Sequence, residues 1–220
     1  LEIEPEVVMG WDIKSCFWLL MMNPFSPWVF INGSIRHGVR KNNLQHRFRT
    51  LIARLSPYVI ANTKAGLEVN LMKPGKTRKV IYNAIDSLPK DEVNIKVNRS
   101  KLIAEAFREQ DSSFKGPVLL SVANLFVIKD YPTVIRALAE VDFDFRYLIV
   151  GEGSERNKIE SLIRELELGD KIALLGRRSD INRLISIADI FINSSKGEGC
   201  SNAILEALTH GKFVLASRVG

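Results

Sequence analysis

The sequence predicts an α/β protein with two parallel sheets that carry helices on both faces. Apolar runs of strand length alternate with segments of helical period along its 220 residues. A polar stretch at 86–92 interrupts this alternation, and the same pattern then begins again. Strands that alternate with helices pair in parallel, and such sheets bind ligands at the carboxyl ends of their strands. We therefore expect a ligand site in a cleft between two similar halves.

The first half of the chain predicts four strands. Its clearest helix is expected over 44–55, where one stripe is apolar. The longest apolar stretch, 16–31, is interrupted by polar residues and prolines, and it is too short to span a bilayer. The helical stripe consists of Leu44, Phe48, Leu51, Ile52 and Leu55. The strands are expected at 7–11, 28–32, 58–62 and 79–82.

The second half predicts a longer series of the same kind. Its strands are expected at 117–123, 145–150, 171–175, 189–193 and 213–216. Its helices are expected at 131–140, 154–166, 180–187 and about 200–210. These patterns divide the chain into a first domain, a linker and a second domain. We expect them at 1–88, 89–116 and 117–220.

Composition and missing motifs exclude several classes of protein. Apolar residues make up 46% and charged residues 25%, which is typical of a globular chain and not of a disordered one. Two cysteines are too few for a disulfide framework and are typical of a reducing compartment. Three histidines without helical spacing argue against a zinc site, so no metal is expected. The chain has no GxxxxGK[ST] phosphate loop, which argues against an ATPase.

Charge is distributed unequally along the chain. Residues 1–115 carry a net charge of +7 and residues 116–220 a net charge of −1. No acidic residue occurs between Asp12 and Glu68, so the basic region 14–64 suits an anionic membrane surface or a phosphate-bearing acceptor. Nucleic acid is an unfavoured partner because no motif for it is present. A solvated basic surface is the simpler alternative. Charge reversal at Arg47 and Arg49 tests the membrane hypothesis.

A Gly-x-Gly turn follows the strand expected at 145–150. Gly151 and Gly153 resemble the start of a dinucleotide-binding motif, but Arg156 stands where the third glycine is needed. We therefore interpret this segment as a tight turn from strand to helix.

The segment 194–211 combines a glycine-rich turn with the start of a helix. If the helix begins near Gly199, its first N–H groups and its dipole form a site for a pyrophosphate. Glu198 and Glu206 are eight residues apart, or about 12 Å along a helix, which suits the sugar and the ribose of one nucleotide sugar. Alternatively, this is a capped helix with a solvated Glu206. The expected N–H donors are Gly199, Cys200, Ser201 and Asn202.

Lys129 follows the strand expected at 117–123, just before a helix. A cation in this loop could neutralise a phosphate at the carboxyl edge of the sheet. A lysine in a loop is more often part of the solvated surface.

Five segments together resemble a known family. They are VLLSVANL at 118–125 with Lys129 and Asp130 after it, YLIVGEG at 147–153, KIALLG at 171–176, ADIFINS at 188–194, and the Glu198–Gly199, Glu206 and Gly211 pattern. Their order and spacing resemble the retaining glycosyltransferases of family 4, also called group 1, which have the GT-B fold of two Rossmann-like halves. VIYNAID at 80–86 is similar to another strand of that family.

The resemblance implies a role for each domain and for the site residues. The first domain would be the remainder of an acceptor-side domain, and the second a truncated donor-binding domain, so that the chain is part of a longer protein. Glu198, which would contact the sugar hydroxyls, and Lys129, on the diphosphate, would be the catalytic residues. Glu206 would bind the ribose. Gly199, Cys200, Ser201 and Asn202 would surround the diphosphate, and Arg178 and Asp180 would lie near the base.

The implied activity is transfer of a sugar, with retention, from a UDP- or GDP-linked donor to a glycan or lipid-linked acceptor. The resemblance implies no metal and no other cofactor. It suggests a role in cell-surface polysaccharide or glycolipid biosynthesis. We expect a cytoplasmic location, with peripheral attachment to the inner face of the cell membrane as a further hypothesis.

Two departures from the family pattern keep other functions open. Asn124, which we still expect among the donor-binding residues, stands where the family usually has an arginine, and neither Asn32 nor His37 matches the family's histidine clearly. A nucleotide-sugar-binding module without catalysis is therefore one alternative. A sugar-nucleotide epimerase with the same fold is another.

Overall fold

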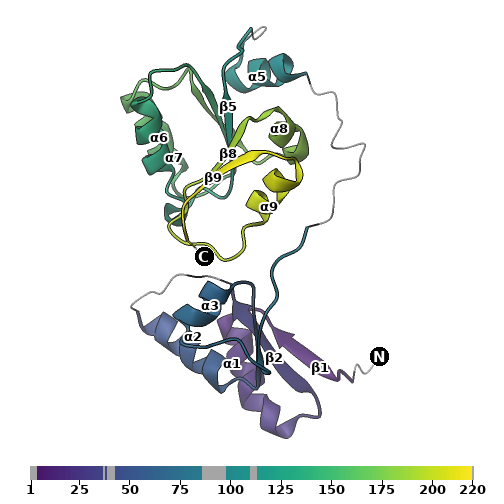
Figure 1. The fold of residues 1–220 in the computed structure, drawn as a ribbon. Helices are drawn as coiled ribbons and strands as arrows, with labels where there is room; N and C mark the ends of the chain where they lie inside the picture. The colour runs from purple at the N-terminus through teal and green to yellow at the C-terminus, as the bar shows by residue number, and fades with distance from the viewer. Residues whose placement is uncertain (1–3, 37, 39–42, 86–97, 110–112, 220) are drawn as a thin grey trace. The chain divides into compact units, whose positions relative to one another are not determined.

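Two parallel sheets define the two units of the chain (Figure 1). The computed structural model describes residues 4–36, 38, 43–85, 98–109 and 113–219. The first unit comprises residues 1–83, 197–201 and 219–220, and the second comprises residues 84–196 and 202–218. The polar stretch at 86–92 and His37 lie outside the described residues.

The first unit contains a four-stranded sheet whose strands follow one another in chain order. Right-handed crossovers between neighbours in that order put every connecting helix on one face. The strands are β1 (Val7–Gly10), β2 (Val29–Ile35), β3 (Tyr58–Ala61) and β4 (Arg78–Val80), all parallel. The helices are α1 (Ile13–Met22), α2 (Leu44–Leu55) and α3 (Lys64–Val69), with the short η1 (Asn23–Phe25) after α1.

Burial alternates along β3 and at the start of β2, as it does in a sheet with one covered face. Phe30 is buried with Cys16 and Ile52, whereas Val29 and Tyr58 remain 43% exposed. Among the described residues no helix covers the second face of this sheet. The expectation of helices on both faces is therefore wrong for this part of the first unit.

Helix α1 lies between the first two expected strands, where a helix was expected but its bounds were not predicted. Its start has a clear local cause, since the Asp12 carboxylate accepts hydrogen bonds from the N–H groups of Lys14 (2.8 Å) and Ser15 (3.1 Å). The backbone N–H of Asp12 donates in turn to the Ser15 hydroxyl (3.3 Å), which completes a capping box. The helix therefore begins at a signal that the sequence contains.

Helix α2 has the predicted bounds but not the burial that an apolar stripe usually has. Such a stripe normally faces the core, yet Leu44, Phe48, Leu51 and Leu55 are all exposed and only Ile52 is buried. Polar contacts hold the opposite side inward: Thr50 donates to Asn70 at 3.0 Å, and His46, 9% exposed, lies 3.4 Å from the carbonyl of Val69. The stripe faces outward as a result.

The second unit contains a five-stranded parallel sheet in the order β7-β6-β5-β8-β9. β6 and β7 follow β5 on one side of it, whereas β8 pairs with the other side of β5 and β9 follows beyond β8. Ligands bind such sheets at this reversal, where neighbouring connections leave toward opposite faces. The strands are β5 (Val118–Val122), β6 (Arg146–Val150), β7 (Ile172–Gly176), β8 (Ile190–Asn193) and β9 (Phe213–Ala216).

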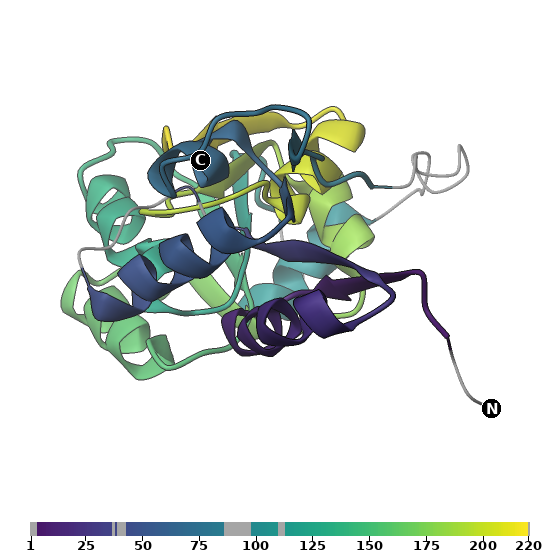
Figure 2. The same cartoon turned by 90° about the horizontal axis from the view of Figure 1, so that it is seen from below.

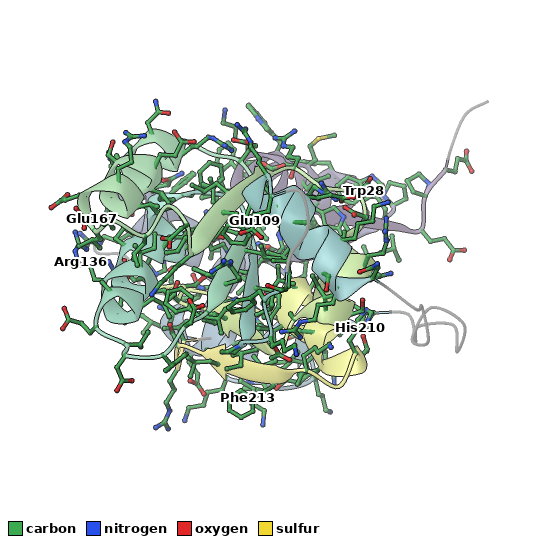
Figure 3. All side chains as sticks on the ribbon, turned by 90° about the horizontal axis from the view of Figure 1, so that it is seen from above. Trp28, Glu109, Arg136, Glu167, His210 and Phe213 are labelled. Carbon is green, nitrogen blue, oxygen red and sulfur yellow. The ribbon has the colours of Figure 1, made fainter. Side chains whose placement is uncertain are left out.

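Helices cover both faces of this second sheet. One core contains Leu119 of β5 with α6 (Tyr131–Ala139) and α7 (Arg156–Glu165), and the other contains Leu120 with the remaining helices. Those helices are α5 (Arg99–Phe107), α8 (Ile181–Ile187) and α9 (Asn202–Thr209). Arg136 and Glu167 project from the outer side of the α6–α7 layer, and Phe213 lies on the edge strand β9 (Figure 3).

Helix α5 lies inside the range 89–116, which we expected to be a linker. Leu102 and Ile103 are buried in the second core, and Arg99 donates to the carbonyl of Gly116 (2.7 Å) and to Asp189 (2.9 Å). This helix is thus part of the second unit. No helix in the described part of the chain is long and apolar enough to cross a membrane.

Candidate functional site

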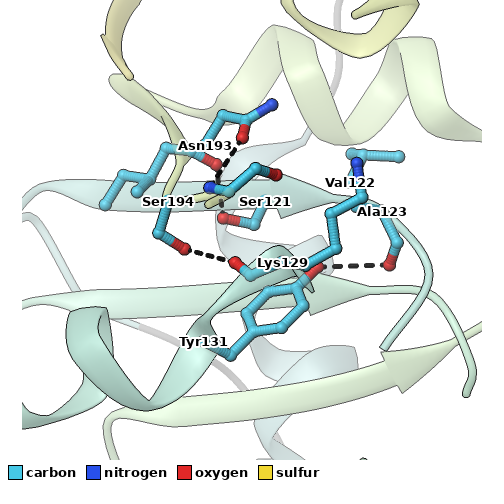
Figure 4. A pocket seen from close by; sticks show the side chains of 9 residues that line it. Ser121, Val122, Ala123, Lys129, Tyr131, Asn193 and Ser194 are labelled. Atoms are coloured by element: carbon cyan, nitrogen blue, oxygen red, sulfur yellow. Dashed lines mark hydrogen bonds between the residues drawn. The ribbon is translucent and has the colours of Figure 1, made fainter. Parts of the chain in front are cut away.

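A pocket lies at the point where the second sheet reverses (Figure 4). The ends of β5 and β8, which are hydrogen-bonded neighbours, form two of its walls. Its volume is about 10 Å³, room for about one water molecule, so a larger ligand could only lie across its mouth. The lining residues are Ser121, Val122, Ala123, Lys129, Tyr131, Ile192, Asn193, Ser194 and Ser195.

Buried hydroxyl groups fix the floor of this pocket. The Ser121 hydroxyl donates to the carbonyl of Ile192 at 2.6 Å and lies 2.7 Å from the hydroxyl of Tyr147. Because Ser121 has a single proton to donate, Tyr147 must be the donor to Ser121. Burial raises the pKa of Tyr147, so its hydroxyl keeps the proton that it donates to Ser121. The contacts tie β5, β6 and β8 together directly below the site.

The loop that carries Lys129 is held by its backbone. Lys129 ends the short helix η2 (Val127–Lys129), and its carbonyl accepts a hydrogen bond from the Ser194 hydroxyl at 2.7 Å (Figure 4). The neighbouring carbonyl of Ile128 accepts from the N–H of Lys196 at 2.8 Å. The Tyr131 hydroxyl donates to the carbonyl of Ala123 at 3.1 Å. These bonds position the half-buried Lys129 without using its ammonium group.

The Gly-x-Gly segment is a structural turn, as its sequence indicated. Gly151 has φ of +142°, and a Cβ there would overlap the carbonyl of Ala123. A Cβ on Gly153 would overlap the carbonyl of Leu125. Leu125 also donates to the carbonyl of Glu152 at 2.9 Å. The two glycines therefore let this turn pack tightly against the loop that leads to Lys129.

Helix α9 begins later than we predicted. It starts at Asn202, whereas Gly199, Cys200 and Ser201 precede it, so the expected start near Gly199 is wrong. Glycine disfavours the helical conformation and serine favours the position before a helix, which accounts for the later start. The first-turn N–H groups are accordingly those of Asn202 and the two residues after it. The 12 Å estimate between Glu198 and Glu206 does not apply, because Glu198 lies outside the helix.

Glu206 lies on α9 and is half-buried. Its carboxylate has no ion-pair or hydrogen-bond partner in the described part of the chain, and burial raises its pKa above the ordinary value. A half-buried carboxylate without a partner is unfavourable in the folded protein by itself, and hydroxyl groups of a ligand could satisfy it.

The raised pKa of Glu206 predicts an effect on stability that depends on pH. The folded protein holds this proton more tightly than the unfolded chain, so stability is lost as pH rises through the interval between the two pKa values. We expect Glu206→Gln to raise the Tm at pH 7 and to leave it unchanged below pH 4, where both side chains are neutral. Thermal melts of the two proteins at these two pH values check this. A Tm that falls equally at both would contradict it.

The other predicted residues are placed differently. Arg178 forms two hydrogen bonds of 2.7 Å with Asp180, which raises the pKa of the arginine and lowers that of the aspartate. Arg178 lines a separate groove of about 510 Å³ between α5, α7 and the edge strand β7. The exposed Asn124 does not line the pocket at the sheet reversal.

The predicted residues also divide between the two units. Asn124, Lys129, Asn202 and Glu206 belong to the second unit, and the segment 197–201, which includes Glu198, groups with the first unit. Within the first unit, Asn83 donates to the carbonyl of Cys200 at 2.9 Å. Sequence reasoning missed Ser121, Tyr131, Asn193 and Ser194 as pocket residues, although all lie in or next to the quoted motifs. Among the described residues, no three His, Cys, Asp or Glu side chains cluster as metal ligands would.

The fold and this pocket define a class: a doubly wound α/β protein with its candidate ligand site at the sheet reversal. The model of the family "Glycosyl transferases group 1" matches residues 103–220, which is more than half of the chain. The protein belongs to the group 1 glycosyltransferase family.

Two curated relatives are similar over most of the chain. N-acetyl-alpha-D-glucosaminyl L-malate synthase of Bacillus anthracis is 26% identical over 86% of this chain and 45% of its own length. A 4-alpha-N-acetylgalactosaminyltransferase of Campylobacter jejuni, named for a diphospho-undecaprenol acceptor, is 30% identical over 76% of this chain and 43% of its own. The chain thus spans less than half the length of either relative.

Solved structures show the same fold. HepE of Anabaena in complex with UDP superposes with a TM-score of 0.78 at 21% identity, over 99% of this chain and 61% of its own. A glycosyltransferase of Rickettsia africae superposes with a TM-score of 0.75 at 19% identity, over 98% of this chain and 58% of its own. The expected fold of two parallel-sheet halves, GT-B, is confirmed.

Proposed function

We propose that this chain contains the donor site of an enzyme that transfers a sugar from a nucleotide-diphosphate donor to an acceptor hydroxyl. The observation that carries the proposal is the placement of Lys129 at the carboxyl ends of β5 and β8, where a doubly wound sheet binds its ligand. The names of similar proteins support it, because they include an N-acetyl-alpha-D-glucosaminyl L-malate synthase and a 4-alpha-N-acetylgalactosaminyltransferase.

The diphosphate and the ribose of the donor each have a candidate partner in the second unit. The Lys129 ammonium group neutralises charge on the diphosphate, and the first N–H groups of α9 donate to the same oxygens. The Glu206 carboxylate accepts from the ribose hydroxyls, which satisfies an otherwise unpartnered charge. Glu198, on the segment 197–201, accepts from the hydroxyls of the transferred sugar. Gly199, Cys200 and Ser201 remain candidates for the diphosphate, and Asn124, Arg178 and Asp180 for further donor contacts.

The chemical problem in this reaction is the departure of a diphosphate while positive charge develops on the sugar. Fixed N–H groups and an ammonium group stabilise the leaving group without reorganising when the bond breaks. We propose that no metal or other cofactor is needed and that the anomeric configuration is retained, as in family 4. The donor is UDP- or GDP-linked; UDP is present in the similar HepE structure.

The proposed acceptor is a glycan or a lipid-linked saccharide in cell-surface polysaccharide or glycolipid biosynthesis. Support comes from relatives named for lipopolysaccharide core biosynthesis in Rhizobium meliloti and for a diphospho-undecaprenol acceptor in Campylobacter jejuni. We propose a cytoplasmic protein that attaches to the inner face of the cell membrane.

The test is sugar transfer by the full-length protein. It is incubated with UDP- and GDP-sugars and a lipid-linked acceptor, with and without EDTA, and NMR determines the anomeric configuration of the product. We expect transfer from one donor, retention, and no effect of EDTA. Isomerisation of the donor without an acceptor would establish the epimerase instead. Nucleotide binding without turnover would establish the non-catalytic module.

A further inference from the structure

The segment 197–201 is held differently from the chain on either side of it. It groups with the first unit, whereas Lys196 and Asn202, which flank it, belong to the second. Glu198, which is proposed to contact the transferred sugar, lies in this segment. The contacts that hold the segment therefore decide where Glu198 can place its carboxylate.

Two hydrogen bonds hold the backbone of this segment. The N–H of Gly38 donates to the carbonyl of Glu198 at 2.9 Å. The side-chain amide of Asn83 donates to the carbonyl of Cys200, two residues further on, at 2.9 Å. Both bonds end on backbone carbonyls, so they fix the path of the segment without using the Glu198 carboxylate. Of these two bonds, the one from Asn83 comes from a side chain, so a substitution can remove it alone.

The residues around this segment follow the carboxyl ends of strands in the first sheet. Arg36 follows β2, Asn62 follows β3, and Asn83 is the third residue after β4. A Cβ on Gly199 would overlap the carbonyl of Arg36 and the side chain of Asn62, so the segment packs directly against this edge of the sheet. These contacts come from the strand ends and not from helices α1 and α2, which lie side by side next to the same sheet (Figure 2).

The loop that carries Asn83 is itself tied to the first sheet. The N–H of Ile81 donates to the carbonyl of Ala61 at 2.9 Å, which extends the pairing of β4 with β3. Asn83 is half-buried, whereas Tyr82 and Ala84 on either side of it are exposed. An inward amide on a loop that is fixed in this way can hold the carbonyl that it bonds in one place.

We propose that Asn83 is a positioning residue for the sugar-binding part of the donor site. By holding the Cys200 carbonyl, it fixes the backbone two residues after Glu198 and keeps the Glu198 carboxylate within reach of the sugar hydroxyls. Catalysis depends on such placement, since a misplacement of about 1 Å can lower a rate about 100-fold. The inference rests on the proposed function, because a bound donor supplies the hydroxyls that Glu198 contacts.

The test compares Asn83→Asp with the wild-type full-length protein. Aspartate has nearly the same shape as asparagine, but its carboxylate cannot donate to the Cys200 carbonyl. We expect kcat for sugar transfer to fall about 10- to 100-fold. The affinity for UDP or GDP without a sugar should stay close to that of the wild type, because Lys129 and Glu206 belong to the second unit.

Two further readouts separate positioning from a general loss of stability. Hydrogen exchange of the free protein in peptides that cover 197–201 should be about 2- to 10-fold faster in Asn83→Asp, because one neutral hydrogen bond is lost. Asn83→Gln keeps an amide donor and should recover part of kcat. The matched control is Asn157→Asp, on the exposed side of α7, which should change neither kcat, nor nucleotide affinity, nor exchange in 197–201.

Thermal melts establish that each variant is folded, and Asn83→Ala, which adds no charge, carries the test if Asn83→Asp is not. An unchanged kcat would overturn the proposal even if the Tm falls, and so would a lower kcat without faster exchange in 197–201. A wild-type protein that transfers no sugar would contradict the proposed function instead. Faster exchange in the variant would then leave Asn83 as an anchor of the segment alone, and unchanged exchange would overturn that role too.

Discussion

Replacing Lys129 with alanine is expected to lower the affinity for a nucleoside diphosphate by about 10- to 100-fold. This range corresponds to the loss of one charge-assisted contact to the diphosphate. The affinity for the nucleoside alone should not change, because it has no phosphate for Lys129 to contact. Isothermal titration calorimetry of the full-length protein measures both affinities, with UDP and uridine or, if the donor is GDP-linked, with GDP and guanosine.

Fold and loop position should survive this substitution. The contacts that hold Lys129 use its backbone carbonyl, which alanine keeps. Lys158→Ala, on the exposed side of α7 in the same unit, is the matched control and should leave both affinities unchanged. An equal loss of affinity for nucleoside and nucleotide would contradict the role given to Lys129.

Replacing Gly153 with alanine is expected to cost at least about 2 kcal/mol of unfolding free energy. The added Cβ would overlap the backbone of Leu125, a residue that is fully buried and cannot move into solvent. The loop after β5 must shift, and Lys129 with it, so nucleotide affinity should fall as well. Urea unfolding measures the first effect and titration with nucleotide the second.

Gly169 provides a matched control in the same unit. A Cβ there meets nothing within 4 Å, so Gly169→Ala should be neutral or slightly stabilising. Equal stability of the Gly153 and Gly169 variants would show that the turn is not packed as described.

Local patterns predicted most of the strands because these strands are buried. Runs such as 118–122 and 146–150 lie at the centre of a doubly covered sheet and are almost wholly apolar, so their bounds agree with the prediction to within about a residue. The predicted strand at 28–32 continues to Ile35 through Gly33 and Ser34, which local propensity disfavours.

Sequence patterns do not decide features that depend on contacts between distant residues. The direction of the α2 stripe depends on the partners of Thr50 and His46, which lie about twenty residues away in the sequence. Likewise, β5 and β8 are neighbours only because of the strand order in the sheet. The hydrogen bond from the Ser121 hydroxyl to the carbonyl of Ile192 could therefore not be predicted from motifs. Family resemblance predicted Lys129, whereas Ser194 became a candidate only through its bond to the Lys129 carbonyl.

The central claim is that a nucleotide binds at the carboxyl ends of β5 and β8. Hydrogen exchange of the full-length protein with saturating UDP, GDP or ADP tests it most directly. We predict that one nucleotide slows exchange in peptides that cover 121–131 and 193–206. Protection confined to 105–108 and 156–178, which line the groove beside β7, or no protection by any nucleotide, would contradict the claim.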